Sequence, residues 1–100
     1  MRYHFCKFYP PRPDFIRTMS EAEAQLMKAH GEYLQSLLTL GKVIAHGPVE
    51  DPAGGFGLSL FVLQEGDDLA TLLERDPMIL AGTGARYEQF RMRQLRWPAI

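Results

Sequence analysis

The segment LSLFVL at residues 58–63 predicts a strand that is buried on both of its faces. Residues of a strand point alternately to its two sides, and apart from Ser59 both alternating sets here are apolar. Helices can cover one face of the sheet that contains this strand, so another layer must cover the opposite face. We expect that layer to be a second copy of the chain, and a ligand pocket against the same face is the alternative.

A long amphipathic helix is predicted between Ser20 and Gly41. Ser20 and Glu23 have the spacing of a capping box, and Gly41 stands where a glycine commonly ends a helix. Spacings of three and four residues place one stripe of side chains on the packing face of this helix. The stripe consists of Leu26, His30, Tyr33, Leu34 and Leu37.

The rest of the chain adds three strands and one short helix to these elements. The resulting order, β-α-β-β-α-β, is that of ferredoxin-like folds. We therefore expect one α+β domain over residues 1–100, with a four-stranded antiparallel sheet and two helices on one of its faces. The expected strands are residues 2–9, 42–48, 58–64 and 86–95, and the expected short helix runs from 67 or 68 to about 75.

Proline and glycine are expected to interrupt this pattern in three places. The proline-rich segment 10–19 predicts a rigid, non-helical loop. Gly47 and Pro48 are expected to end the second strand, and residues 76–84 to be irregular or to form a helical turn.

Composition restricts the partners and the compartment. A net charge of −1 and a pI near 6.3 give no basis for binding nucleic acid or an anionic membrane. No apolar run is long enough to span a bilayer, and the N-terminal segment lacks the pattern of a signal peptide. The single cysteine, Cys6, fits a reducing cytoplasm, and its place in a strand favours burial over reactivity.

Two polar residues occupy positions where apolar side chains are expected. His30 lies on the packing face of the long helix, and Asp76 follows Leu69, Leu72 and Leu73 at offsets that also place it inward. Taken alone, His30 is more simply a buried structural histidine, and Asp76 is more simply the cap of a turn opened by Pro77. Together they form a possible pair in which the aspartate fixes the imidazole tautomer, so that the ring serves as a general base.

Other chemistries have weaker support. His4, His30 and His46 are far apart in the sequence, so we expect no metal site, and we expect no cofactor. Ser59 could act as a nucleophile only beside a base, and a hydrogen-bonded strand hydroxyl is the simpler interpretation.

Several short motifs together resemble the YciI-like (YCII-related) domain family over residues 2–95. The motifs are HGEYL from His30, GKVIAHGP at 41–48, DP at 51–52, GGFGL at 54–58, DPM at 76–78 and RYEQFRM at 86–92. The resemblance implies a ferredoxin-like subunit that pairs into a dimeric α+β barrel. It also implies an active site built from the helix histidine and the aspartate of the DP segment, which correspond to His30 and Asp76.

The resemblance extends to the surroundings of that pair and to the class of reaction. Gly47 and Pro48 would shape the rim of the pocket, and together with Ser59 they are the candidate substrate-binding residues. Family members with assigned chemistry act on small cyclic or aromatic-derived molecules by proton abstraction, isomerisation or elimination. The proline-rich segment 10–19 departs from shorter members, and it could cover or reshape the pocket.

These observations predict a cytoplasmic homodimer that binds a small molecule. Its expected activity is that of a lyase or isomerase in which His30 abstracts a proton from a small organic acid or ring compound and Asp76 orients the imidazole. The alternative is a non-catalytic module that uses the same pocket to bind a small metabolite or a partner.

Overall fold

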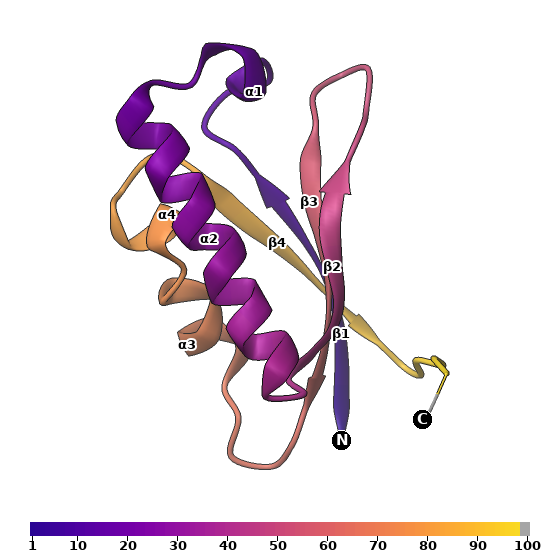
Figure 1. Cartoon of the computed structure of the whole chain (residues 1–100). Helices are drawn as coiled ribbons and strands as arrows, with labels where there is room; N and C mark the ends of the chain where they lie inside the picture. The colour runs from indigo at the N-terminus through magenta and orange to yellow at the C-terminus, as the bar shows by residue number, and fades with distance from the viewer. Residues whose placement is uncertain (99–100) are drawn as a thin grey trace.

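A computed structural model describes residues 1–98 and contains a four-stranded antiparallel sheet with helices on one face (Figure 1). The strand order β2-β3-β1-β4 is that of ferredoxin-like folds, so the predicted architecture is confirmed. Helix α1, of four residues, is added to the expected elements, and α4, also of four residues, is the helical turn that was one of the two expectations for residues 76–84. In chain order the elements are β1 (Arg2–Tyr9), α1 (Phe15–Thr18), α2 (Glu21–Thr39), β2 (Val43–Val49), β3 (Phe56–Leu63), α3 (Leu69–Glu74), α4 (Pro77–Leu80) and β4 (Arg86–Met92).

Helix α2 begins and ends at the residues that the sequence indicates. The side chain of Ser20 accepts a hydrogen bond from the backbone N–H of Glu23, and the carboxylate of Glu23 accepts one from the backbone N–H of Ser20. At the other end Gly41 has a φ of 76°, a left-handed conformation that glycine adopts without steric cost. The capping box and the terminal glycine are both confirmed.

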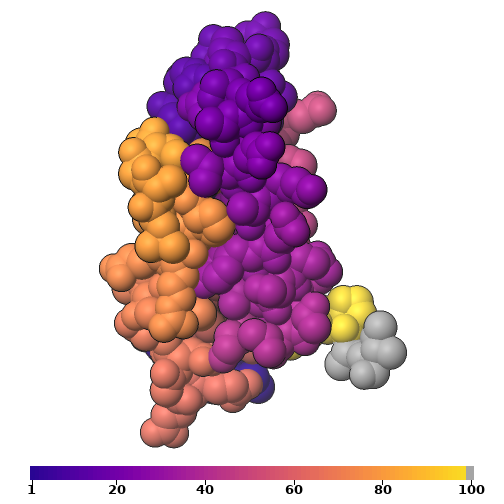
Figure 2. Space-filling model, turned by 60° about the vertical axis from the view of Figure 1, so that its left-hand side comes forward, coloured from indigo at the N-terminus to yellow at the C-terminus, as the bar shows by residue number. Residues whose placement is uncertain are grey.

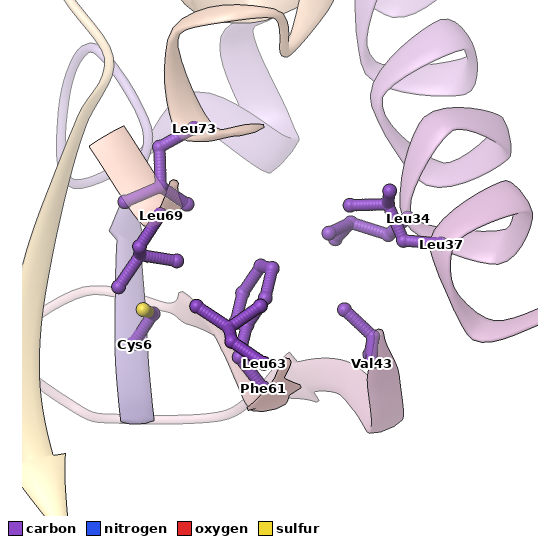
Figure 3. Close-up of a cluster of buried hydrophobic side chains, with 8 residues drawn as sticks. All are labelled: Cys6, Leu34, Leu37, Val43, Phe61, Leu63, Leu69 and Leu73. Atoms are coloured by element: carbon purple, nitrogen blue, oxygen red, sulfur yellow. The ribbon is translucent and has the colours of Figure 1, made fainter. Parts of the chain in front are cut away.

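The main hydrophobic core lies between α2, α3 and the sheet. Figure 3 shows side chains of α2 and α3 converging on those of three strands. Burying these apolar side chains supplies most of the free energy that holds the helices against the sheet. The cluster consists of Cys6, Leu34, Leu37, Val43, Phe61, Leu63, Leu69 and Leu73.

The helices form a single layer along the sheet. Figure 2 shows α2 in purple and magenta beside the orange segment that contains α3 and α4, and α2 and α4 are in direct contact. No helix in the part of the chain that the structure describes is both long enough and apolar enough to cross a membrane.

The proline-rich segment is the first correction to the predicted elements, because it contains a short helix, α1. The three prolines of this segment all precede Asp14, so none of them removes an N–H donor from inside the helix. Phe15 is fully buried against Phe8 and Met78, and Arg12 forms a two-point ion pair with Glu23 of the capping box. The segment is therefore attached to α2 and to the sheet rather than forming a free loop.

The strand boundaries differ from the prediction at five places. The start of β2 at Val43 and the end of β3 at Leu63 each differ by one residue. Strand β2 does not end at Gly47 and Pro48 but continues to Val49. Pro48 has no backbone N–H to donate, but β2 is an edge strand, so no strand on its outer side needs that hydrogen bond. Strand β3 begins at Phe56, two residues earlier than expected. Strand β4 ends at Met92, three residues earlier than expected.

No helix or strand of residues 1–98 covers the second face of the sheet. At one end of this face Val62 is nevertheless buried, and Tyr3 beside it packs edge-on against Trp97. The strand register places the predicted set Leu58, Leu60 and Val62 on this face, opposite to Phe61 and Leu63. The face continues onto β1 and β4, where Phe5 and Phe90 pack together at a ring-centroid distance of 5.6 Å. An apolar sheet face of this kind requires a further layer.

Replacing Phe15 with alanine tests whether the proline-rich segment is anchored by packing. The change leaves a cavity beside Phe8 and Met78, so we expect it to lower the free energy of unfolding by about 3–5 kcal/mol. Ile16 is the matched control, since it is the next residue of the same helix and its exposed fraction is 66%. Urea unfolding should place Ile16→Ala within about 0.5 kcal/mol of the unmutated protein. Equal effects of the two changes would contradict the assignment.

Candidate active site

Asp76 lies in the break between α3 and α4, at the N-cap of α4. Its Oδ1 atom accepts a hydrogen bond of 2.9 Å from the backbone N–H of Met78, and Pro77 is the first residue of the helix. This is the cap that the Asp-Pro sequence predicts. The cap uses one carboxylate oxygen and leaves the second oxygen for other partners.

The second oxygen of Asp76 joins the cap to the long helix. Oδ2 accepts a hydrogen bond of 2.6 Å from Nδ1 of His30 and a bond of 2.5 Å from the hydroxyl of Tyr87. Asp76 is fully buried, and His30 is 7% exposed. The two interpretations of Asp76, as a cap and as the partner of His30, therefore hold at the same time, one on each oxygen.

The hydrogen bonds to Asp76 decide its charge. Burial alone would raise the pKa of the carboxyl group, but the bonds from His30, Tyr87 and the N–H of Met78 outweigh it and bring the pKa below its ordinary value of 3.8. Burial and the adjacent carboxylate raise the pKa of Tyr87, so the tyrosine keeps its proton and remains a donor. Asp76 is a carboxylate at neutral pH.

An ionised Asp76 fixes the tautomer of His30. The carboxylate can only accept, so Nδ1 of His30 carries the proton that it donates, and in the neutral ring Nε2 holds the free lone pair. Over residues 1–98, His4 Nδ1 is the one enclosed side-chain N or O atom without a hydrogen-bond partner. Nε2 of His30 also has no hydrogen-bond partner within residues 1–98, so this atom retains some exposed surface.

The ring of His30 rests on Phe8 of β1. The two rings are stacked, with centroids 4.2 Å apart and planes inclined by 29°. A Cβ atom on Gly57, the β3 partner of Phe8, would lie 3.3 Å from the Cβ of Phe8, so a glycine leaves room for the phenylalanine. On the other side of Phe8, β4 places Tyr87 directly opposite, with ring centroids 5.3 Å apart. Phe8 thus packs against the ring of His30, and Tyr87 donates a hydrogen bond to Asp76, so β1 and β4 each hold one member of the pair.

The predicted substrate-binding residues lie at different distances from this pair. Pro48 belongs to the same row across the sheet as Gly57 and Phe8, whereas Gly47 lies one position away on β2. Ser59 lies in the neighbouring row, between Cys6 of β1 and His46 of β2, and it is almost fully buried. Burial, and to a smaller extent the proximity of His30, lower the pKa of His46. No hydrogen bond joins Gly47, Pro48 or Ser59 to the pair, and their role in binding stays a prediction.

The sequence interpretation missed Phe8 and Tyr87 as residues of the site. Each lies in a strand in which aromatic and polar residues alternate only loosely, so neither stands out from its neighbours. Their proximity follows from the register of β1 with β4, which places Phe8 opposite Tyr87. A prediction of the sheet order together with the register would have found them.

Metal binding and thiol chemistry have no support in residues 1–98. Within residues 1–98, no cluster of three histidine, cysteine or acidic side chains is placed to hold a metal ion. Cys6 is fully buried, as predicted, and burial raises the pKa of its thiol to about 12, so it is not a nucleophile at neutral pH.

Solved structures with a similar fold are known. The fold resembles that of 5-chloro-2-hydroxyhydroquinone dehydrochlorinase from Burkholderia phenoliruptrix AC1100 in complex with 2,5-dihydroxybenzoquinone, with a TM-score of 0.54, 19% identity, and coverage of 95% of this chain and 93% of that one. A formyltetrahydrofolate deformylase from Pseudomonas putida KT2440 has a TM-score of 0.45 and 12% identity, covering 90% of this chain and 28% of that one. A protein of unknown function from Nitrosomonas europaea has a TM-score of 0.42 and 17% identity, covering 98% of this chain and 95% of that one.

The sequence comparisons identify the family. No curated protein matches the chain. The YCII-related domain, however, matches residues 1–93, which is nearly the whole length. This match agrees with the resemblance that the short motifs carry, and the chain belongs to the YCII-related domain family.

Proposed function

We propose that this protein is a small-molecule enzyme of the lyase or isomerase type in which His30 acts as a general base. The observation that carries the proposal is the hydrogen bond of 2.6 Å between Nδ1 of His30 and the buried Asp76. A carboxylate at Nδ1 holds the imidazole in the tautomer whose Nε2 can take a proton, and it stabilises the imidazolium that forms. Asp76 is then a positioning residue, and Tyr87 holds Asp76.

The substrate class proposed here is a small cyclic compound or organic acid with an acidic C–H bond. Nε2 removes a proton from a carbon next to a carbonyl group, and the electron pair stays on the substrate as an enolate. In an isomerisation the imidazolium returns the proton to another atom of the substrate. In an elimination the leaving group departs with the electron pair of its bond, and the imidazolium then releases the proton to water. The dehydrochlorinase with a similar fold binds a ring compound, 2,5-dihydroxybenzoquinone. At 19% identity this suggests only the first probes to try.

We also propose that the open face of the sheet is covered by a second copy of the chain, as in dimeric α+β barrels. The middle of the face is apolar over three strands, with Lys7, Arg86 and Glu88 toward one end, and an identical apolar patch is its simplest complement. A homodimer would bury Leu58, Leu60 and Phe90, which otherwise remain in contact with water.

Deuterium exchange tests the general base without knowledge of the complete reaction. The probes are cyclic monoketones such as cyclohexanone in D2O, with 2,5-dihydroxybenzoquinone as a binding competitor, and the measurement is the rate of loss of the α C–H signal by proton NMR above the buffer background. We expect exchange with the unmutated protein and a loss of about 100-fold or more in His30→Gln. The matched control is His46→Gln, which should retain most of the rate.

Each other result of the exchange experiment has a clear meaning. Unchanged exchange in His30→Gln would remove His30 as the base. Saturable binding of a probe without any exchange would instead favour the module that binds a metabolite without catalysis.

The charge on Asp76 predicts how stability depends on pH. The pKa of Asp76 is below 3.8 in the folded state, so the ionised carboxylate stabilises the fold above that pH, and this contribution is lost as the pH falls through the lowered pKa. Asp76→Asn can keep the cap but loses the charge, and we expect it to lower the free energy of unfolding by about 1.5–3 kcal/mol at pH 7. Urea unfolding should show this difference shrinking below pH 4. A difference that stays constant down to pH 2.5 would mean that the charge does not stabilise the fold.

Introducing a charge on the open face tests the dimer. Leu60→Glu buries a carboxylate in the proposed interface, so we expect the protein to become monomeric. Leu40→Glu is the control, since Leu40 is 68% exposed at the end of α2, away from the sheet face. Light scattering after size-exclusion chromatography gives the masses. If the unmutated protein is monomeric at micromolar concentration, the open face is not a dimer interface.

A further inference from the structure

A second hollow lies at the end of β1, away from the His30 pair. Its volume is about 340 Å³, and its walls are the proline-rich segment 10–13, the loop between β2 and β3, and the first residue of β4. Figure 1 places the β2–β3 loop and the segment before α1 at the same end of the sheet. The size is within the range of pockets that hold small ligands.

Close backbone packing fixes the shape of this hollow. Gly54 has a φ of 137°, and a Cβ atom there would lie 3.2 Å from the Cβ of Pro13. Gly84 has a φ of 96°, and its Cβ would lie 3.9 Å from the Cβ of Pro11. Glycines in left-handed conformations therefore bring the two loops up to the rigid prolines, and the hollow is largely formed before a ligand arrives.

Two cations line the hollow, and each stacks on an aromatic ring. The ammonium group of Lys7 lies 5.0 Å from the ring centroid of Phe56, and the guanidinium of Arg86 lies 4.2 Å from that of Tyr9. Within residues 1–98, neither cation forms an ion pair, whereas Lys42 and Arg12 each do. The aromatic rings hold the two cations in place, so both are available for an anion.

The other charged groups of the hollow are already occupied. Arg12 is paired with Glu23 at two points, and Asp51 accepts a hydrogen bond from the backbone N–H of Ala53 in its own turn. Glu88 lies opposite Lys7 in the register of β1 with β4, and it accepts a hydrogen bond of 2.9 Å from the hydroxyl of Tyr9. Asp51 and Glu88 thus balance the two positive charges, but each already accepts a hydrogen bond from the protein. The N–H donors of Lys7 and Arg86, which contact only aromatic rings, are the groups left to bind a ligand, and they favour an anion.

We propose that this hollow binds a small aromatic carboxylate. Arg86 and Lys7 would hold the carboxylate, for which the guanidinium offers a two-point contact, and the prolines together with Phe56 would contact the flat apolar ring. The site is separate from His30, because Lys7 and Tyr9 point to the open face of the sheet while Phe8 between them points to the helices.

Titration of the 15N-labelled protein with benzoate, followed by amide chemical shifts, tests this proposal. We expect saturable shifts concentrated in residues 7–13, 51–56 and 84–86. Benzamide, which has the same shape without the charge, should bind at least about tenfold more weakly. Arg86→Gln and Lys7→Gln should each weaken benzoate binding by a similar factor.

The matched control is Arg91→Gln, which removes the same charge from the opposite face of the same strand. It should bind benzoate as the unmutated protein does, and so should His30→Gln, since the two sites are distinct. The proposal is wrong if benzoate causes no saturable shifts, if benzamide binds equally well, or if Arg86→Gln and Arg91→Gln have the same effect. It is also wrong if the shifts centre on His30 and disappear in His30→Gln, and that last result would leave the proposed general base intact.

Discussion

The carboxylate of Asp76 is the interaction on which the candidate site depends. One oxygen caps α4, and the other accepts hydrogen bonds from His30 and Tyr87, so a single buried side chain joins the long helix, the short helix and the last strand. Burial of a carboxylate without hydrogen-bond partners would be very unfavourable. Here three donors, from His30, Tyr87 and the backbone N–H of Met78, offset the cost of burying Asp76. The geometry of His30 is thus set by the same contacts that fold this part of the chain.

The parts of the fold that the sequence predicts are those with local signals. Ser20, Glu23 and Gly41 mark the ends of α2 by their own side chains or backbone preferences, and His30 and Asp76 are placed inward by spacing alone. The pair itself was a prediction that needed two elements to pack correctly, and the hydrogen bond between the two residues is present.

The parts that the sequence does not predict depend on distant residues. Pro48 continues a strand only because that strand is at the edge of the sheet. Helix α1 forms because Phe15 finds a buried site against Phe8 and Met78, although the preceding prolines suggest a loop. Tyr87 joins the site through the pairing of β1 with β4. None of these contacts leaves a mark in the adjacent sequence, so no local pattern could reveal them.

The alternation of side chains at the end of β1 has a mechanical consequence. Lys7 and Tyr9 line the hollow on one face, and Phe8 between them carries the imidazole of His30 on the other. A ligand that shifts the backbone of these three residues would therefore move the ring of Phe8, on which the imidazole of His30 is stacked. By thermodynamic linkage, a molecule held at His30 would change the affinity of the hollow by the same factor. Three consecutive residues of β1 thus link the wall of the hollow to the ring on which His30 is stacked.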